Sequence, residues 1–115
     1  MNRSNLRTAI LIFGLVTTAI HFYLNFNTGK FEFQPVFTLN ALGYLALLGA
    51  LLVKPAFLAG RERLVHYVFI GYTAVTIVAY FAVNGAGAFS NPIGLVAKVD
   101  EVLLIAALWM DLRQL

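Results

Sequence analysis

The sequence predicts an all-α integral membrane protein whose four helices form an up-down-up-down bundle. The 115 residues are 61% hydrophobic and 11% charged, with a mean hydropathy of +0.84, and soluble domains are far less apolar than this. Four apolar segments, 8–26, 37–53, 64–83 and 93–112, each approach the roughly 17 to 25 residues that a spanning helix needs. These segments lack the apolar/polar alternation of barrel strands. Helices are therefore the expected spanning elements.

Turn-forming residues separate the four segments. "NTGK" at 27–30 and Pro35 lie between the first and second, and Pro55 and Gly60 lie between the second and third. "SNP" at 90–92 supplies an N-cap and a proline at the start of the fourth. Connections this short make consecutive helices antiparallel neighbours. We therefore expect residues 1–115 to form a single transmembrane domain.

Basic residues predict the orientation of the bundle. Six of them lie on the side that holds both ends of the chain, namely Arg3, Arg7, Lys54, Arg61, Arg63 and Arg113. The opposite side carries only Lys30. The positive-inside rule then places both termini in the cytoplasm, and we expect a prokaryotic plasma (inner) membrane. The first segment continues into bulky aromatic residues without a small-x-small cleavage site, so we expect it to be retained.

Small and polar residues recur at helical spacing and predict the inward faces. They are Gly14, Thr18, His21 and Asn25 in the first segment, Asn40, Gly43, Ala46 and Ala50 in the second, and Thr73, Thr76 and Tyr80 in the third. Close packing through small residues is normal in membrane bundles. We expect Gly14, Gly43, Ala46 and Ala50 to provide it.

The fourth segment contains three charged residues, Lys98, Asp100 and Glu101, in "AKVDEV". With about 1.5 Å of rise per residue, these residues reach the same outer half of the bundle as His21, Asn40 and Tyr80. Lys98 and Glu101 are three apart and are expected to pair, whereas Asp100 points elsewhere and has His21 as its natural partner.

Three interpretations of this charged cluster remain open. The helix could begin nearer Val99 and leave the charges in the headgroup zone. The cluster could line an outer-facing pocket that binds a cation or passes a proton, because ionisable residues in membranes usually face a cavity. It could also be a docking site for a partner subunit.

Other chemistries find little support in the sequence. The absence of cysteine excludes disulfides, iron–sulfur clusters and thiolate metal sites. His21 and His66 are expected about 20 Å apart in depth, too far to hold one haem within one chain. Ser4 and Ser90 lie outside the spans, so no hydrolase triad is expected. We predict no catalytic residue and no metal site, and leave open whether a lipid, quinone, pigment or haem is bound.

Four stretches, "TAIHFYLNF", "FTLNALGYLALL", "GYTAVTIVAYF" and "KVDEVLLI", together resemble a group of small four-helix prokaryotic membrane proteins over nearly the whole chain. The resemblance implies a histidine in the first span and a charged cluster in the fourth, and it implies no particular activity.

The functional expectation is a non-enzymatic accessory or assembly subunit. Four short helices bury little between themselves, so we expect contact with membrane lipid and either packing against a larger complex or self-association. The alternative is an oligomeric proton or cation conduit, or a transporter, built around His21, Asn40, Tyr80, Lys98, Asp100 and Glu101. The net charge of +3 follows from the orientation and requires no nucleic acid.

Overall fold

Four helices make up almost all of the computed structural model. It describes the backbone of residues 2–23, 26–27, 30–31, 35–90 and 92–115, and the side chains of residues 2–23, 38–90 and 92–115. The helices are α1 (Arg3–Tyr23), α2 (Pro35–Leu52), α3 (Glu62–Asn84) and α4 (Pro92–Leu112). They match the four predicted segments closely, and the all-α fold class is confirmed.

The connections contain short ordered elements. Strands β1 (Phe26–Asn27) and β2 (Lys30–Phe31) pair antiparallel between α1 and α2, with Asn27 opposite Lys30. A 3₁₀ turn, η1 (Ala56–Leu58), follows α2, and a second, η2 (Gly85–Ser90), follows α3. The first predicted segment ran to residue 26, whereas α1 ends at Tyr23. Asn25, predicted on the inward face, lies outside the described residues.

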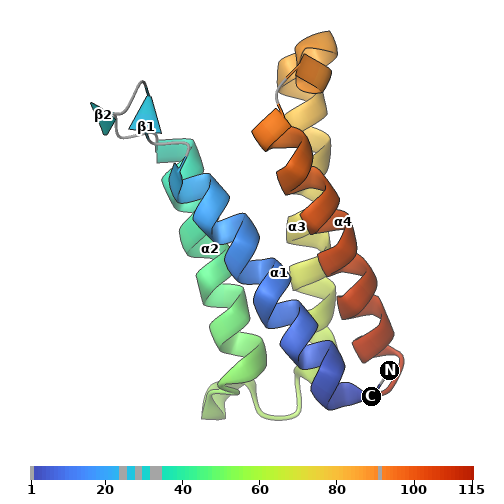
Figure 1. The fold of residues 1–115 in the computed structure, drawn as a ribbon. Coiled ribbons are helices and arrows are strands. Elements are labelled where there is room, and N and C mark those ends of the chain that lie inside the picture. Colours follow the sequence, from blue (N-terminus) through green and yellow to red (C-terminus); the bar gives the residue numbers. More distant parts are fainter. Residues whose placement is uncertain (1, 24–25, 28–29, 32–34, 91) are drawn as a thin grey trace.

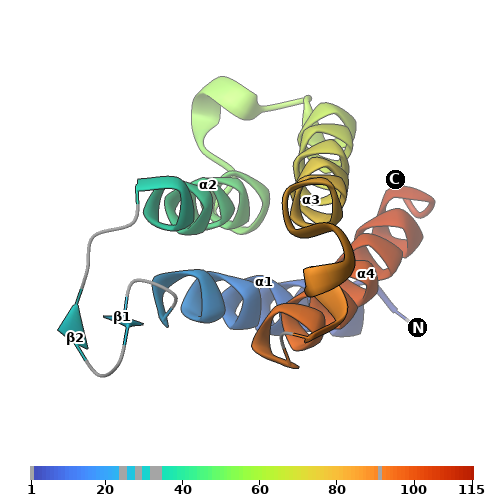
Figure 2. The ribbon, with the colours of Figure 1, turned by 90° about the horizontal axis from the view of Figure 1, so that it is seen from above.

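Successive helices run antiparallel, as the short connections predicted. Both termini and η1 lie at one end of the bundle, and the strands and η2 lie at the other (Figure 1). Seen from above, α1, α2, α3 and α4 follow one another around the bundle, so that α1 contacts both α2 and α4 (Figure 2). The pairs α1/α2 and α3/α4 diverge toward the end that holds the strands (Figure 1).

An apolar core fills the half of the bundle nearer the termini. All four helices contribute to it: Ile10, Tyr44, Leu48, Leu51, Val65, Phe69, Leu104, Ala107 and Leu108. Full burial of one such side chain stabilises the fold by about 1.5 to 3 kcal/mol. This core holds the helices together between the termini and the polar residues in the middle of the bundle.

The buried face of α2 differs from the predicted one. Its buried residues are Ala41, Tyr44, Leu48 and Leu51, whereas Ala46 is exposed, and Gly43 and Ala50 are half-buried. The prediction for Ala46 was wrong because nearly every residue of this helix is apolar or small, so spacing alone does not define a face. On α1 and α3 the prediction is confirmed, since Gly14, Thr18, His21, Thr73 and Thr76 are buried.

Three glycines leave room for side chains of neighbouring helices. A Cβ atom at Gly14 would lie 2.7 Å from Cδ2 of Leu48. A Cβ atom at Gly43 would collide with the hydroxyl of Tyr72, and one at Gly94 with the hydroxyl of Tyr80. Close approach of helices at small residues is therefore confirmed at Gly14 and Gly43.

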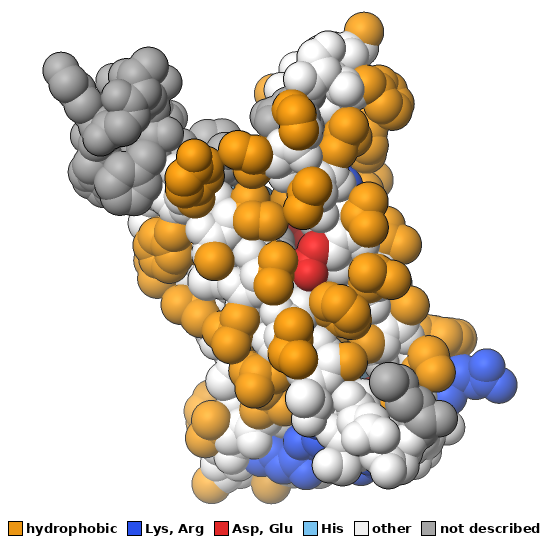
Figure 3. All heavy atoms as spheres, viewed as in Figure 1, with side chains coloured by type: hydrophobic (Ala, Val, Ile, Leu, Met, Phe, Trp, Pro, Cys, Tyr) orange, Lys and Arg blue, Asp and Glu red, His pale blue; other side chains and the backbone are white. Residues whose placement is uncertain are grey.

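Apolar side chains cover the outer surface. Figure 3 shows them over the middle of one face, with a small acidic area among them, while most visible Lys and Arg side chains lie toward the end that holds the termini. Among the described residues, Arg3–Tyr23 and Glu62–Ser90 are long and apolar enough to cross a membrane, by length and composition. Only 33% and 28% of their apolar windows are buried.

Candidate functional site

The central cluster consists of Thr17, His21, Tyr44, Lys98 and Glu101, and the carboxylate of Glu101 is its centre. Lys98 Nζ lies 2.6 Å from Oε2 and 3.0 Å from Oε1 of Glu101. The hydroxyls of Thr17 and Tyr44 donate to Oε1 at 3.1 Å and 3.4 Å. Glu101 is fully buried, so α1, α2 and α4 all supply donors to one carboxylate. The predicted pair of Lys98 with Glu101 is confirmed.

His21 joins this cluster through Thr17. Its Nδ1 lies 2.7 Å from the Thr17 carbonyl oxygen, which can only accept, so Nδ1 carries a proton. The ring also lies 5.9 Å from the Tyr44 ring, measured between centroids. Both His21 and Asp100 are described, and no hydrogen bond or ion pair joins them, so the predicted pair of these two residues is wrong. Depth along the helices matched, but the direction of the side chains did not.

Lys98 is buried and points toward α3. Its Nζ lies 5.1 Å from the ring centroid of Tyr80, whose hydroxyl donates to the carbonyl of Ala88 at 2.6 Å. Lys98 is only 6% exposed, and α4 begins at Pro92, two turns earlier. The interpretation in which the helix begins nearer Val99 is therefore wrong, and its charged side chains are buried in the bundle.

Asp100 is close to this cluster but outside its hydrogen-bond network. Its side chain is 7% exposed, and its Oδ2 atom is buried without a hydrogen-bond partner. Lys98 is already held by both oxygens of Glu101. Oε2 of Glu101 likewise has no hydrogen bond, but it lies 2.6 Å from Lys98 Nζ. The two carboxylates in the middle of α4 thus differ in that one has a described cation beside it.

Asn40 lies on a different interface, between α2 and α3. Its Nδ2 donates to the hydroxyl of Thr76 at 3.3 Å, and its carbonyl accepts from the hydroxyl of Tyr72 at 2.8 Å. The Tyr72 ring packs edge-on against Tyr44 at 4.9 Å. Asn40 thus fixes α2 against α3 and does not contact the charged residues with which it was predicted to group.

A second cluster of charged residues lies at the end that holds the termini. This end cluster consists of Arg3, Lys54, Glu62, His66 and Asp111. Asp111 is fully buried and accepts from Arg3 Nε at 3.0 Å through Oδ1. Its Oδ2 lies 2.7 Å from Nε2 of His66, which is also fully buried.

Both ring nitrogens of His66 have polar partners. Nδ1 lies 2.7 Å from the carbonyl oxygen of Glu62, so Nδ1 must be the donor. Nε2 on the other side of the ring faces the Asp111 carboxylate. The His66 ring is thus held between the backbone of α3 and a side chain of α4.

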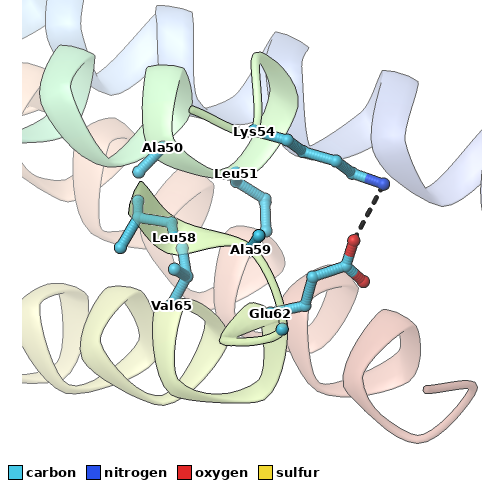
Figure 4. A pocket seen from close by; sticks show the side chains of 8 residues that line it. Ala50, Leu51, Lys54, Leu58, Ala59, Glu62 and Val65 are labelled. Carbon is cyan, nitrogen blue, oxygen red and sulfur yellow. Dashed lines mark ion pairs between the residues drawn. The ribbon is translucent and has the colours of Figure 1, made fainter. Parts of the chain in front are cut away.

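Glu62 completes the end cluster near the surface. Lys54 Nζ lies 2.8 Å from its Oε1, and Arg3 Nη2 lies 3.7 Å from its Oε2. The hydrogen bond from Lys54 is the main reason that the pKa of Glu62 is lowered from its usual 4.5. This pair lies at a pocket of about 190 Å³ whose apolar wall includes Leu51, Leu58 and Val65 (Figure 4).

The end cluster was not predicted from the sequence, in which the depth of His66 was compared only with that of His21. A signal was present, since the predicted topology puts Arg3, His66 and Asp111 at the same end and depth. A comparison of depths had grouped His21 with the charges of α4. Applied to the other end of the bundle, it would have grouped these three residues.

An apolar layer separates the two clusters. Between Glu101 and Asp111, α4 contributes Leu104 and Leu108, both fully buried, and α3 contributes the fully buried Phe69. Ten residues of helix correspond to about 15 Å. Within the part of the chain that is described, the two clusters are thus separate sites.

Comparison with protein-family models, with curated proteins and with solved structures finds no match. Among the described residues, no group of three or more His, Asp or Glu side chains is arranged to hold a metal ion.

Proposed function

We propose that the protein is a four-span membrane protein with both termini in the cytoplasm, and that it acts as an accessory or assembly subunit by packing against other membrane helices. The observation on which this rests is the distribution of charge and apolar surface over the bundle.

Charged side chains occur in only two kinds of place among the described residues. Those with exposed or half-exposed side chains are Arg3, Arg7, Lys54, Arg61, Glu62, Arg63 and Arg113, all at the end that holds the termini. The others, Lys98, Asp100, Glu101 and Asp111, are buried. Six basic residues against one exposed acidic residue at one end favour a cytoplasmic location for that end.

Exposed apolar side chains support insertion in a bilayer. All four helices carry them, for example Ile12, Leu42, Val75 and Val102, which are 49 to 68% exposed. In the core helix of a soluble protein most residues would be buried, whereas only 33% and 28% of the two spanning windows are buried here. Helices of 21 residues are about 30 Å long, which matches the hydrocarbon thickness.

Two features support the role as a partner-binding subunit, namely the internal pairing of the polar groups and the apolar character of the outer surface. Most buried polar groups form hydrogen bonds within the bundle and hold the four helices in place, while the outer surface is extensive and apolar. Association of such surfaces in lipid depends on shape and on a few polar contacts, so a partner subunit or a second copy fits this surface.

A proton or cation conduit is the second candidate, favoured by the buried ionisable residues at mid-depth. The apolar layer of Phe69, Leu104 and Leu108 closes a path through one chain. A conduit would therefore have to form between copies.

Two measurements on the purified protein test these proposals. Native mass measurement after gentle extraction from the producing cell should give a hetero-complex or a homo-oligomer, and a monomer alone would contradict the subunit role. A pH-sensitive dye in proteoliposomes should report no flux above that of protein-free vesicles. A flux above that of protein-free vesicles would instead support the conduit.

A further inference from the structure

The formal charges at mid-depth do not balance among the described side chains. Lys98 supplies one positive charge, and Asp100 and Glu101 supply two negative ones. Both oxygens of Glu101 contact Lys98, while Oδ2 of Asp100 is buried without a hydrogen-bond partner. An isolated carboxylate in an apolar medium is strongly unfavourable. Asp100 therefore needs a hydrogen-bond donor or a cation that the described residues do not supply.

An apolar groove lies on α4 about one turn before Asp100, which does not itself line it. Val96 is four residues before Asp100 on α4, so both lie on the same side of the helix. The groove has a volume of about 360 Å³ and is lined by Ile20 and Tyr23 of α1 and by Pro92, Ile93 and Val96 of α4. In Figure 3 acidic atoms are visible among apolar side chains in the middle of the face on which α1 and α4 lie in front. We call this groove together with Asp100 the α1/α4 seam.

We propose that the α1/α4 seam binds a transmembrane helix of a partner protein that carries a Lys or Arg near the middle of the bilayer, with its apolar residues along the groove and its cation paired with Asp100. This inference rests on the proposed function as a partner-binding subunit and specifies the chemistry of the partner. A charge-assisted hydrogen bond to a carboxylate is roughly twice as strong as a neutral one. In lipid it would also select one partner over other apolar helices.

Charge complementarity favours a different protein over a second copy of this chain. A second copy would bring its own Asp100 toward the seam, and two carboxylates repel. Among the described residues, Lys98 is the only basic residue at this depth, and it is buried against Glu101. The other described basic residues lie at the end that holds the termini.

Binding of model transmembrane peptides tests the inference. Three leucine-rich peptides of about 24 residues, long enough to span the bilayer, differ only at the central position, which is Lys, Leu or Glu. The full-length protein is labelled at Phe57→Cys, since the chain has no other cysteine. Energy transfer to labelled peptide in phosphatidylcholine vesicles then measures association.

We expect the Lys peptide to bind wild type at least about tenfold more tightly than the Leu peptide, and the Glu peptide to bind no better than Leu. Asp100→Asn should remove the advantage of Lys and leave binding of the Leu peptide unchanged. Val96→Ala is the matched control on the same face, and it should weaken the Lys and Leu peptides alike because it alters only the groove.

Equal binding of the Lys and Leu peptides to wild type would overturn the inference, and this comparison needs no variant. Binding of the Glu peptide as tight as that of the Lys peptide would overturn it as well, because Asp100 would then be acting as a neutral acid. Either result together with a native hetero-complex leaves the proposed function intact. A monomer in the native mass measurement would instead contradict the proposed function itself.

Discussion

The fully buried Glu101 accepts hydrogen bonds from three helices, so its replacement should lower the stability of the whole bundle. Glu101→Gln leaves Lys98 buried without its anion and weakens the contacts from Thr17 and Tyr44. We expect the free energy of unfolding to fall by about 3 to 5 kcal/mol, the usual effect of breaking a buried ion pair. Reversible unfolding in mixed detergent micelles measures it.

The double variant Lys98→Met with Glu101→Gln provides the control. It removes the stranded cation, so it should be more stable than Glu101→Gln alone. Additive losses from the two changes would show that Lys98 and Glu101 do not interact.

At the other end of the bundle, Asp111→Asn should destabilise the protein by a similar amount, about 3 to 5 kcal/mol. The fully buried His66 loses its carboxylate, and Arg3 loses its closest acceptor. Arg113→Gln, an exposed site two residues away, should change stability by less than about 0.5 kcal/mol. Thermal melts of the two variants side by side make the comparison, and equal melting temperatures would contradict the role given to Asp111.

The pair of Glu62 and Lys54 should respond to acid. Because the folded-state pKa of Glu62 lies below its usual 4.5, the stabilisation is present above that value and is lost as the pH falls through the folded-state pKa. The pair is partly exposed, so its contribution is at most about 1 kcal/mol. In Lys54→Met the pKa of Glu62, followed by carboxyl ¹³C NMR, should rise, and an unchanged titration would show that Lys54 is not the cause.

At the level of residues, only contacts within one helix could be predicted from spacing. Lys98 and Glu101 pair because residues three apart share a helical face. The contacts of His21 with Thr17 and of His66 with Asp111 depend on how far each helix is rotated about its axis. Hydropathy gives depth and leaves this rotation undefined, so the partner of His21 was predicted wrongly and that of His66 was missed.

At the level of elements, glycines determine how closely the helices approach. Gly43→Ala should destabilise the bundle, because its methyl group would displace the hydroxyl of Tyr72 from the carbonyl of Asn40. Gly49, on the same helix, has nothing within 4 Å of a new Cβ atom. Gly49→Ala should therefore stabilise the protein by roughly 0.5 to 1 kcal/mol through helix propensity. Melting temperatures that move in the same direction for both would contradict the packing described at Gly43.

The helices themselves were predictable because each is a long apolar run, and Gly, Pro or Asn residues lie in the three connections between them. The orientation of α2 was not. Its sequence "LNALGYLALLGALL" has apolar or small residues on every side, so burial of Tyr44 and exposure of Ala46 are decided by the neighbouring helices. On α1 and α3, threonines and histidines interrupt the apolar residues, and there the inward face could be predicted.

For the whole molecule, the proposed topology predicts opposite accessibility of the two ends. Single cysteines at Phe57→Cys and Gly87→Cys, both at exposed positions, should react with a membrane-impermeant maleimide from opposite sides of right-side-out vesicles. Gly87→Cys should react in intact vesicles, and Phe57→Cys only after permeabilisation. Reaction of both without permeabilisation would contradict the four-span arrangement.

The ion pair within α4 also bears on how the protein is made. In the proposed bilayer, each charge near the middle of an inserting helix raises the free energy of insertion by about 2.5 to 3.5 kcal/mol. Lys98 and Glu101 belong to the same helix, so they can neutralise each other while α4 leaves the translocon, before it meets another helix. Because α4 follows α1 and α2 in the sequence, Thr17 and Tyr44 are made before Glu101. In the proposed bilayer, α1 and α2 thereby serve as the template onto which the later helix docks.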